Sequence, residues 1–179
     1  MNATAITTRP AKHTDFLPVS ELLRGFLTLH QPWRPEQFHL QPLGFTEAIF
    51  QTWLEQPNSL HLAAEKDHGV VGYASAYRWQ GIGTEFTFAR KGCHISLIVV
   101  SPAHRRMGVG RALFGAIETW AEDFGAEYIG LNVEHPNEAA KAFYSSAGYS
   151  VSGEYRTKTL RRVQRLTNQP PVPLSNDDH

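Results

Sequence analysis

The sequence predicts an α/β fold in which one mixed, mostly antiparallel sheet carries helices on both faces. Two observations support this prediction. Segments with apolar residues at helical spacing alternate with segments rich in β-branched residues along most of the 179 residues. Short turns join several of the expected strands, and such hairpins make antiparallel neighbours. No internal repeat and no second domain are visible.

The first third of the chain is expected to be mainly helical. A short strand over Ala5–Arg9 is closed by Pro10. Asp15 can cap a helix that runs to about His30, because six apolar residues follow it at steps of three or four. A proline-rich loop over 31–43 precedes a second helix over Thr46–Glu55.

A hairpin and a central strand come next. The strands Leu60–Lys66 and Val70–Trp79 flank Asp67-His68-Gly69, a turn sequence that favours a tight hairpin. A glycine-containing connection over 80–91 leads to the strand Cys93–Val100, which is rich in Ile, Val and Leu. The central helix is expected over Val109–Phe124, with Gly125 at its C-cap.

The last part of the chain repeats this alternation on a smaller scale. A strand over Tyr128–Val133 precedes a helix that Asn137 caps and Gly148 ends. A final hairpin is expected from Tyr149–Ser152 and Glu154–Leu160. Residues 1–160 are therefore predicted to form a single domain, and residues 161–179, with three prolines, a tail without a core of its own.

Composition narrows the classes of function. Seventeen basic and seventeen acidic side chains cancel, which argues against binding to nucleic acid or to a membrane surface as the main task. The N-terminus has no long apolar run, and Cys93 is the one cysteine, so a reducing cytoplasm is expected. The nine histidines show no metal-ligand spacing, so no metal site is expected.

The turn between the central strand and the central helix has the features of a phosphate site. Backbone N–H groups at a helix N-terminus have no acceptor within the helix and lie at the positive end of its dipole. Gly108 and Gly110 lack side chains that would keep a ligand away, and Arg105, Arg106 and Arg111 bracket the turn. No Gly-Lys-Ser/Thr follows, so this is not a P-loop, and Leu113 stands where a dinucleotide fingerprint needs glycine.

Two motifs resemble those of the GNAT family of N-acetyltransferases. The coenzyme A loop of that family, Val-x-Pro followed by Arg/Gln-x-x-Gly-x-Gly/Ala, corresponds to Val100-Ser-Pro102 and to Arg105-Arg-Met-Gly108-Val-Gly110. The second motif, Asn-x-x-Ala, then Leu/Phe-Tyr, three residues and Gly-Phe/Tyr, corresponds to Asn137 through Tyr149. Both motifs lie in the family's order and on the expected elements. The resemblance runs from about Ile6 to Leu160.

The resemblance implies a GNAT-like sheet of about seven strands. Its two middle strands, here 93–100 and 128–133, would splay apart at their C-terminal ends and admit the pantetheine arm of acetyl-coenzyme A. The implied coenzyme-binding residues are Ile98, Val99, Val100, Arg105, Arg106, Met107, Gly108, Val109, Gly110, Arg111, Asn137, Ala140, Phe143 and Tyr144.

The implied reaction is direct acetyl transfer to a primary amine. A backbone N–H on the central strand, best placed at Val100, would stabilise the carbonyl oxygen, and Tyr144 would protonate the departing thiolate. Many relatives carry a glutamate base where this chain has Ser96. Alternation along the strand puts His94, Ser96, Ile98 and Val100 on one face, so His94 could take the proton from the amine, directly or through water. Glu134 and His135 are the other candidates, and there need be no single base.

The acceptor site is expected in the loop 30–39, the connection 80–91 and the final hairpin. Its aromatic candidates are Trp33, Phe38, Trp79, Phe86 and Tyr155. They would suit an acceptor, a small molecule or a peptide, with an apolar or a cationic part. The protein would be a monomer or a homodimer. Two alternatives stay open: a coenzyme A sensor without turnover, and a nucleotide-binding oxidoreductase, against which Leu113 argues.

Overall fold

The computed structural model describes residues 5–39 and 44–158. These residues form two compact units that join between Asn132 and Val133. The first unit contains ten elements, and the second contains the helix α4, Glu138–Ser146. The elements of the first unit are β1 (Thr7–Pro10), η1 (His13–Asp15), α1 (Phe16–His30), α2 (Glu47–Leu54), β2 (Ser59–Lys66), β3 (Gly69–Gln80), β4 (Lys91–Val100), η2 (Pro102–His104), α3 (Val109–Phe124) and β5 (Tyr128–Leu131).

The first unit is built on a five-stranded sheet in the order β1-β2-β3-β4-β5. The pairs from β1 to β4 are antiparallel, and β5 pairs parallel to β4. The crossover through α3 makes this parallel pair possible, because parallel strands need a long connection. The prediction of a mixed, mostly antiparallel sheet is confirmed. The expected seven strands are not, since the described part of the chain holds five.

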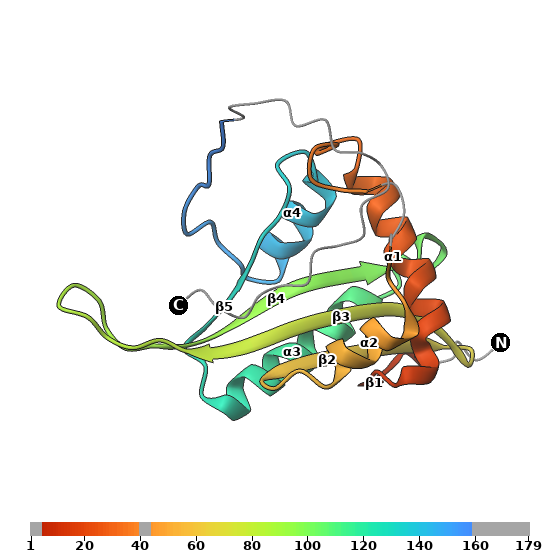
Figure 1. Ribbon diagram of the computed structural model, residues 1–179, viewed down its shortest axis with the longest axis horizontal. Coiled ribbons are helices and arrows are strands. Elements are labelled where there is room, and N and C mark those ends of the chain that lie inside the picture. Colours follow the sequence, from red (N-terminus) through yellow and green to blue (C-terminus); the bar gives the residue numbers. More distant parts are fainter. Residues whose placement is uncertain (1–4, 40–43, 159–179) are drawn as a thin grey trace. The chain divides into compact units, whose positions relative to one another are not determined.

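Helices cover both faces of this sheet (Figure 1). On one face, α1 and α2 pack on Tyr73 and Val99 through a core that includes Val19 and Phe50. On the other face, α3 lies so close to β3 that a Cβ on Gly72 would be 2.8 Å from Val109 Cγ1. Successive residues of a strand point to opposite faces, so Gly72 faces α3 and Tyr73 faces α1 and α2.

The β2–β3 hairpin is confirmed, and most of the predicted boundaries agree with the observed ones within about two residues. Asp67 and His68 both have positive φ, 51° and 65°, as a two-residue turn of type I′ requires. The helix α3 begins and ends at the predicted residues, and Gly125 follows it with φ 76°. Thr46 caps α2 by accepting a hydrogen bond from the backbone N–H of Ile49.

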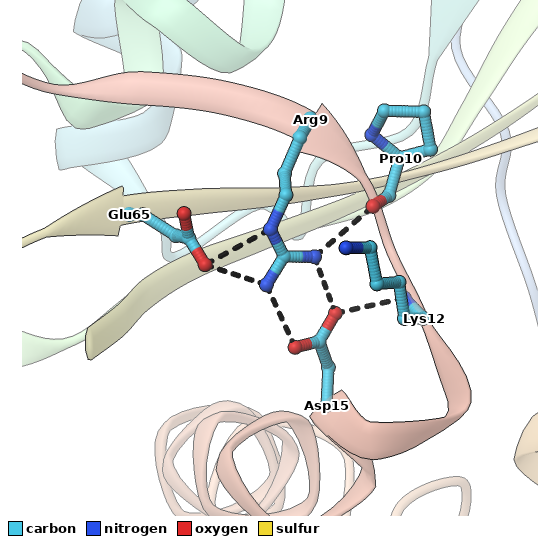
Figure 2. Close-up of polar contacts among 5 residues, drawn as sticks. All are labelled: Arg9, Pro10, Lys12, Asp15 and Glu65. Atoms are coloured by element: carbon cyan, nitrogen blue, oxygen red, sulfur yellow. Dashed lines mark hydrogen bonds and ion pairs between the residues drawn. The ribbon is translucent and has the colours of Figure 1, made fainter. Parts of the chain in front are cut away.

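Asp15 has a different role from the predicted helix cap. It occupies the N-cap position of α1, but its side chain makes no capping bond there. Its carboxylate instead accepts two hydrogen bonds from Arg9, at 2.7 and 2.9 Å, and one from the backbone N–H of Lys12 at 2.8 Å (Figure 2). Arg9 also donates to Glu65 on β2. This cluster ties the first strand, the second strand and the start of α1 together.

The second unit contains α4, whose start and end agree with the prediction. The Asn137 side chain accepts a hydrogen bond from the N–H of Ala140 at 3.1 Å and so caps the helix. Gly148 follows the helix with φ 89°. The division of the chain into two units leaves the single domain over 1–160 a prediction, and the tail 161–179 lies outside the described residues.

The expected final hairpin over 149–160 is wrong for the residues described, because none of residues 149–158 is in a strand. Tyr149 packs against Tyr144, but Val151 and Tyr155 are each 92 % exposed, so the segment has no continuous buried apolar face. A two-stranded hairpin without such a face is only marginally stable in water. Residues 159 and 160 lie outside the described part of the chain. No helix within the described ranges is long and apolar enough to cross a membrane.

Candidate functional site

The strands β4 and β5 part midway along β4. Their pairing covers Gly92 to Ile95 on β4 and Tyr128 to Leu131 on β5, and it stops there. β4 continues to Val100, still paired with β3 on its other side. The structure therefore opens the sheet between the two strands that the family resemblance implies should splay.

The backbone of β4 beyond this point presents polar groups to the opening. Ser101 N donates to Val71 O at 2.9 Å, which makes Ser101 and Val71 a hydrogen-bonded pair. In an antiparallel ladder such pairs alternate, so Leu97 and Val99 direct their backbone groups toward β3. Ile98 and Val100 direct theirs toward the edge that β5 has left, where an extended ligand can pair with them.

A β-bulge corrects one prediction about this strand. Ser75 pairs with Leu97, but its neighbour Ala76 pairs with Ile95, so Ser96 is an extra residue in β4. The insertion reverses the alternation of side chains. His94 consequently shares a face with Leu97 and Val99, on the side of α1 and α2, and not with Ile98 and Val100 as strict alternation predicts.

The loop from β4 to α3 has a backbone shaped for an anion. Arg106 has φ 63°, a conformation that costs a non-glycine residue about 1 kcal/mol or more, and Gly108 has φ 90°. Such left-handed residues turn neighbouring N–H groups to one side. The first helical acceptor is Gly108 O, which binds Ala112 N at 3.0 Å, so the N–H groups of 108–111 precede the helical ladder.

Cationic side chains complete this loop. Arg105, Arg106 and Arg111 are all exposed, and Arg105 Nε lies 3.4 Å from Val100 O at the open edge. A cavity of about 340 Å³ lies beside it, lined by Val99, Val100 and Arg105 and by residues of α1. His104 Nδ1, in η2, is buried without a partner in the described part of the chain. The loop can therefore hold a pyrophosphate by backbone donors and by charge.

His94 lies one residue before the last pair of β4 with β5. Its ring contacts Tyr77 on β3, with centroids 5.3 Å apart. Burial lowers the pKa of His94, so the imidazole is neutral at neutral pH and can accept a proton. Ser96, at the family's usual glutamate position, is exposed and has no ionisable group.

The other predicted catalytic residues lie in the second unit. The ring of Tyr144 lies between Phe143 and Tyr149, at centroid distances of 5.8 and 6.2 Å. Burial raises the pKa of Tyr144, so its phenol stays protonated at neutral pH. Glu134 uses its backbone oxygen to accept from Asn137 N at 2.9 Å. The Asn137 amide, expected to contact the coenzyme, is engaged as the cap of α4.

The predicted acceptor residues separate into distinct groups. Trp33 and Phe38 both pack against His30, at ring distances of 5.1 and 5.5 Å, in an aromatic cluster at the end of α1. Trp79 packs against Tyr128 on the sheet, while Phe86 and Tyr155 are 94 % and 92 % exposed. Tyr77 and Tyr128 were not named from the sequence as neighbours of Trp79. Alternation from Tyr73 along β3 nevertheless puts Tyr77 on the same face as Trp79.

Comparisons with known proteins agree with this geometry. The model of the Acetyltransferase (GNAT) family matches residues 23–149. An uncharacterized N-acetyltransferase of Mycobacterium bovis is 28% identical over 118 residues, which cover 66% of this chain and 68% of the relative.

Solved structures share the fold at low sequence identity. A mutant protein from Bacillus halodurans has a TM-score of 0.81 at 24% identity, covering 87% of this chain and 99% of that one. An aminoglycoside N-acetyltransferase in complex with CoA has a TM-score of 0.65 at 18% identity, covering 90% of this chain and 98% of its own.

Proposed function

Since this chain belongs to the GNAT family of acetyltransferases, we propose that it moves an acetyl group from acetyl-coenzyme A to a primary amine. The observation that carries the proposal is the junction of the open edge of β4 with the Arg105–Arg111 loop. Backbone groups suited to a pantetheine arm lead there directly to backbone donors suited to a pyrophosphate.

The binding roles follow from the described geometry. Ile98 and Val100 offer backbone groups to an extended arm, and the N–H groups of 108–111 offer four donors to phosphate oxygens. Arg105, Arg106 and Arg111 add charge, and Met107 and Val109 lie within the same turn. Ala140 and Phe143 on α4 keep the coenzyme-contacting roles that the second motif implies.

The thioester supplies an activated carbonyl and a leaving thiolate. We assign Val100 N–H as the donor to the carbonyl oxygen, because it is directed to the open edge. His94, neutral at neutral pH, takes the proton that the amine must lose, and Tyr144 gives a proton to the departing sulfur. Glu134 is the second candidate for the base. Tyr144 and Glu134 are assigned from the motif that the chain shares with its family.

The decisive experiment is acetyl transfer to a panel of primary amines, read by release of the free thiol. The panel contains aliphatic amines, polyamines, aromatic amines, an aminoglycoside and a peptide with a free N-terminus. We expect thiol release above the rate of hydrolysis with at least one class. Coenzyme binding without release for any class would make the protein a coenzyme sensor, and stabilisation by NAD equal to that by acetyl-coenzyme A would contradict the assignment.

A further inference from the structure

Four aromatic side chains form a surface on one face of the sheet. It is the same face on which α1 and α2 pack, at the part of the strands beyond the core that these helices cover. The strand register aligns Trp79, Gly92 and Tyr128 in one row across β3, β4 and β5. The next row is Tyr77, His94 and Gly130. Residues directly opposite one another point to the same face. We call Tyr77, Trp79, His94 and Tyr128 the aromatic platform.

Glycines shape the platform. The rings of Trp79 and Tyr128 are 5.8 Å apart at 79°, and they close over Gly92. A Cβ on Gly92 would lie 2.9 Å from Tyr128 Cζ and 3.0 Å from Trp79 Cε2, and a Cβ on Gly81 would lie 2.6 Å from Trp79 Cζ3. The indole thus lies against two backbone positions that have no side chain, and its orientation is preset.

The platform is open where the core on the same face is closed. Along β3, Tyr73 is fully buried beneath α2, but Tyr77 is 44 % exposed and Trp79 is 38 % exposed. Large aromatic side chains that stay exposed beside one another on a sheet offer a ready contact for a flat apolar group. Packing of the core therefore does not account for their exposed surface.

The charges around the platform select between an aromatic and a cationic ligand. The Arg90 guanidinium already lies 4.3 Å from the centroid of Tyr128. Its Nε is held 3.2 Å from the Glu127 carboxylate. A second cation would have to displace the guanidinium from the ring of Tyr128, whereas an uncharged ring can contact Trp79 and Tyr77 without doing so. The platform thus favours an aromatic group over a polycation.

The platform also adjoins the proposed chemistry. The row of His94 directly precedes Ile95 and Leu131, the last pair before β4 and β5 part. The row of Trp79 lies two residues away along the strands, a separation of about 6–7 Å. We propose that the acceptor is an arylalkylamine, whose ring lies on Trp79 and Tyr77 and whose amine reaches His94 across a linker of two or three carbons. This inference rests on the proposed function.

The test compares 2-phenylethylamine with butylamine and spermidine as acceptors. We expect kcat/KM for 2-phenylethylamine to exceed that for butylamine about 10-fold or more, because the ring adds apolar contact. Trp79→Ala should remove most of this preference, so that the ratio of kcat/KM for 2-phenylethylamine to kcat/KM for butylamine falls toward one. Trp79→Phe should keep most of it, and Leu17→Ala, a change at a 73 % exposed side chain on α1, should change neither value.

Different results would reject the arylalkylamine acceptor and the proposed acetyltransferase function. Equal kcat/KM for the three amines, a preference for spermidine, or an equal loss for all amines in Trp79→Ala would reject the platform while acetyl transfer stands. Failure of both coenzyme binding and thiol release would reject the function itself. Should the coenzyme bind without turnover, calorimetry with 2-phenylethylamine decides: binding that Trp79→Ala weakens at least 5-fold supports the platform, and no binding rejects it.

Discussion

The hydroxyl group of Tyr144 is the proposed proton donor to the departing thiolate. Tyr144→Phe keeps the ring between Phe143 and Tyr149 and deletes only this donor. General acid catalysis is worth ~10²–10⁴-fold, and a thiolate leaves fairly well unprotonated, so we expect kcat to fall about 10²-fold. Coenzyme affinity and melting temperature should stay close to those of the original protein. Full turnover in the variant would assign the proton to water, and lost coenzyme binding would make Tyr144 a binding residue.

His94 should determine how the rate depends on pH. A base must be unprotonated, and burial lowers the pKa of His94 below its ordinary value of 6.5. The rate should therefore hold through pH 7 and fall only as the pH drops below about 6.5. His94→Ala should lower kcat/KM at pH 7 and remove this acid limb, which is measured as the dependence of kcat/KM on pH from 5 to 8. An unchanged profile would shift the role to Glu134, His135 or water.

At the scale of the element, the N-terminus of α3 should decide coenzyme binding. Gly110→Glu adds a side chain and a negative charge where four backbone donors precede the helical ladder. We expect coenzyme affinity to fall at least 10-fold, measured by calorimetry, while circular dichroism shows the fold retained. Gly115→Glu is the matched control, because a Cβ there meets nothing within 4 Å and the position lies beyond the first turn of α3. Equal affinity in both variants would place the phosphates elsewhere.

The Arg9 cluster joins three elements and should contribute to stability. Burial raises the pKa of Asp15, but the hydrogen bonds from Arg9 and Lys12 outweigh it, so the pKa is lowered from 3.8. Removing Arg9 leaves a carboxylate in a residue that is only 5% exposed. We expect Arg9→Ala to lower the free energy of unfolding in urea at pH 7 by about 3 kcal/mol. Arg24→Ala breaks an exposed pair with Glu21 and should cost about 0.5 kcal/mol or less.

The pH dependence of the Arg9 effect checks its origin. A carboxylate whose folded pKa is lowered stabilises the fold above its unfolded pKa, and this contribution is lost as pH falls. The difference between the original protein and Arg9→Ala should thus shrink as the pH drops below about 4. A difference that stays constant down to pH 3 would show that Arg9 acts through packing of its side chain alone.

Local patterns predict the elements well where one pattern acts alone. The apolar spacing of α3, its closing glycine and the Asp67–His68 turn each specify a single backbone conformation. The position of Ser96 cannot be predicted this way, because a bulge is defined by the register with β3. The capping role predicted for Asp15 is wrong because its carboxylate accepts hydrogen bonds from Arg9 on β1 instead of from the first turn of α1.

The same contrast holds for the candidate site. The spacing of glycines and arginines is enough to indicate the coenzyme loop, because those residues are neighbours in the chain. Trp79 is one aromatic residue among several in the sequence, whereas Tyr128 joins it only through the pairing of β4 with β5. A site assembled across strands depends on the register, which local patterns in the chain do not specify.

At the scale of the whole molecule, the coenzyme should stabilise the fold. A ligand that binds only the folded state at a hundredfold excess over its Kd adds about 2.7 kcal/mol. For a chain of this size the melting temperature should rise by about 5–10 °C with acetyl-coenzyme A in a thermal scan. NAD at the same concentration is the control and should produce no comparable rise. No shift with acetyl-coenzyme A would contradict the assignment of the loop.

The parting of β4 from β5 also affects how readily the purified protein aggregates. Beyond Ile95, β4 is paired only with β3 among the residues described, so the strand keeps an edge along which no other strand pairs with Ile98 and Val100. Such an edge is a template on which a second chain can add a strand. A ligand bound along that edge would prevent a second chain from adding a strand there and would therefore reduce aggregation. The turbidity of the purified protein should therefore rise sooner after the coenzyme is removed by dialysis than in buffer that contains the coenzyme.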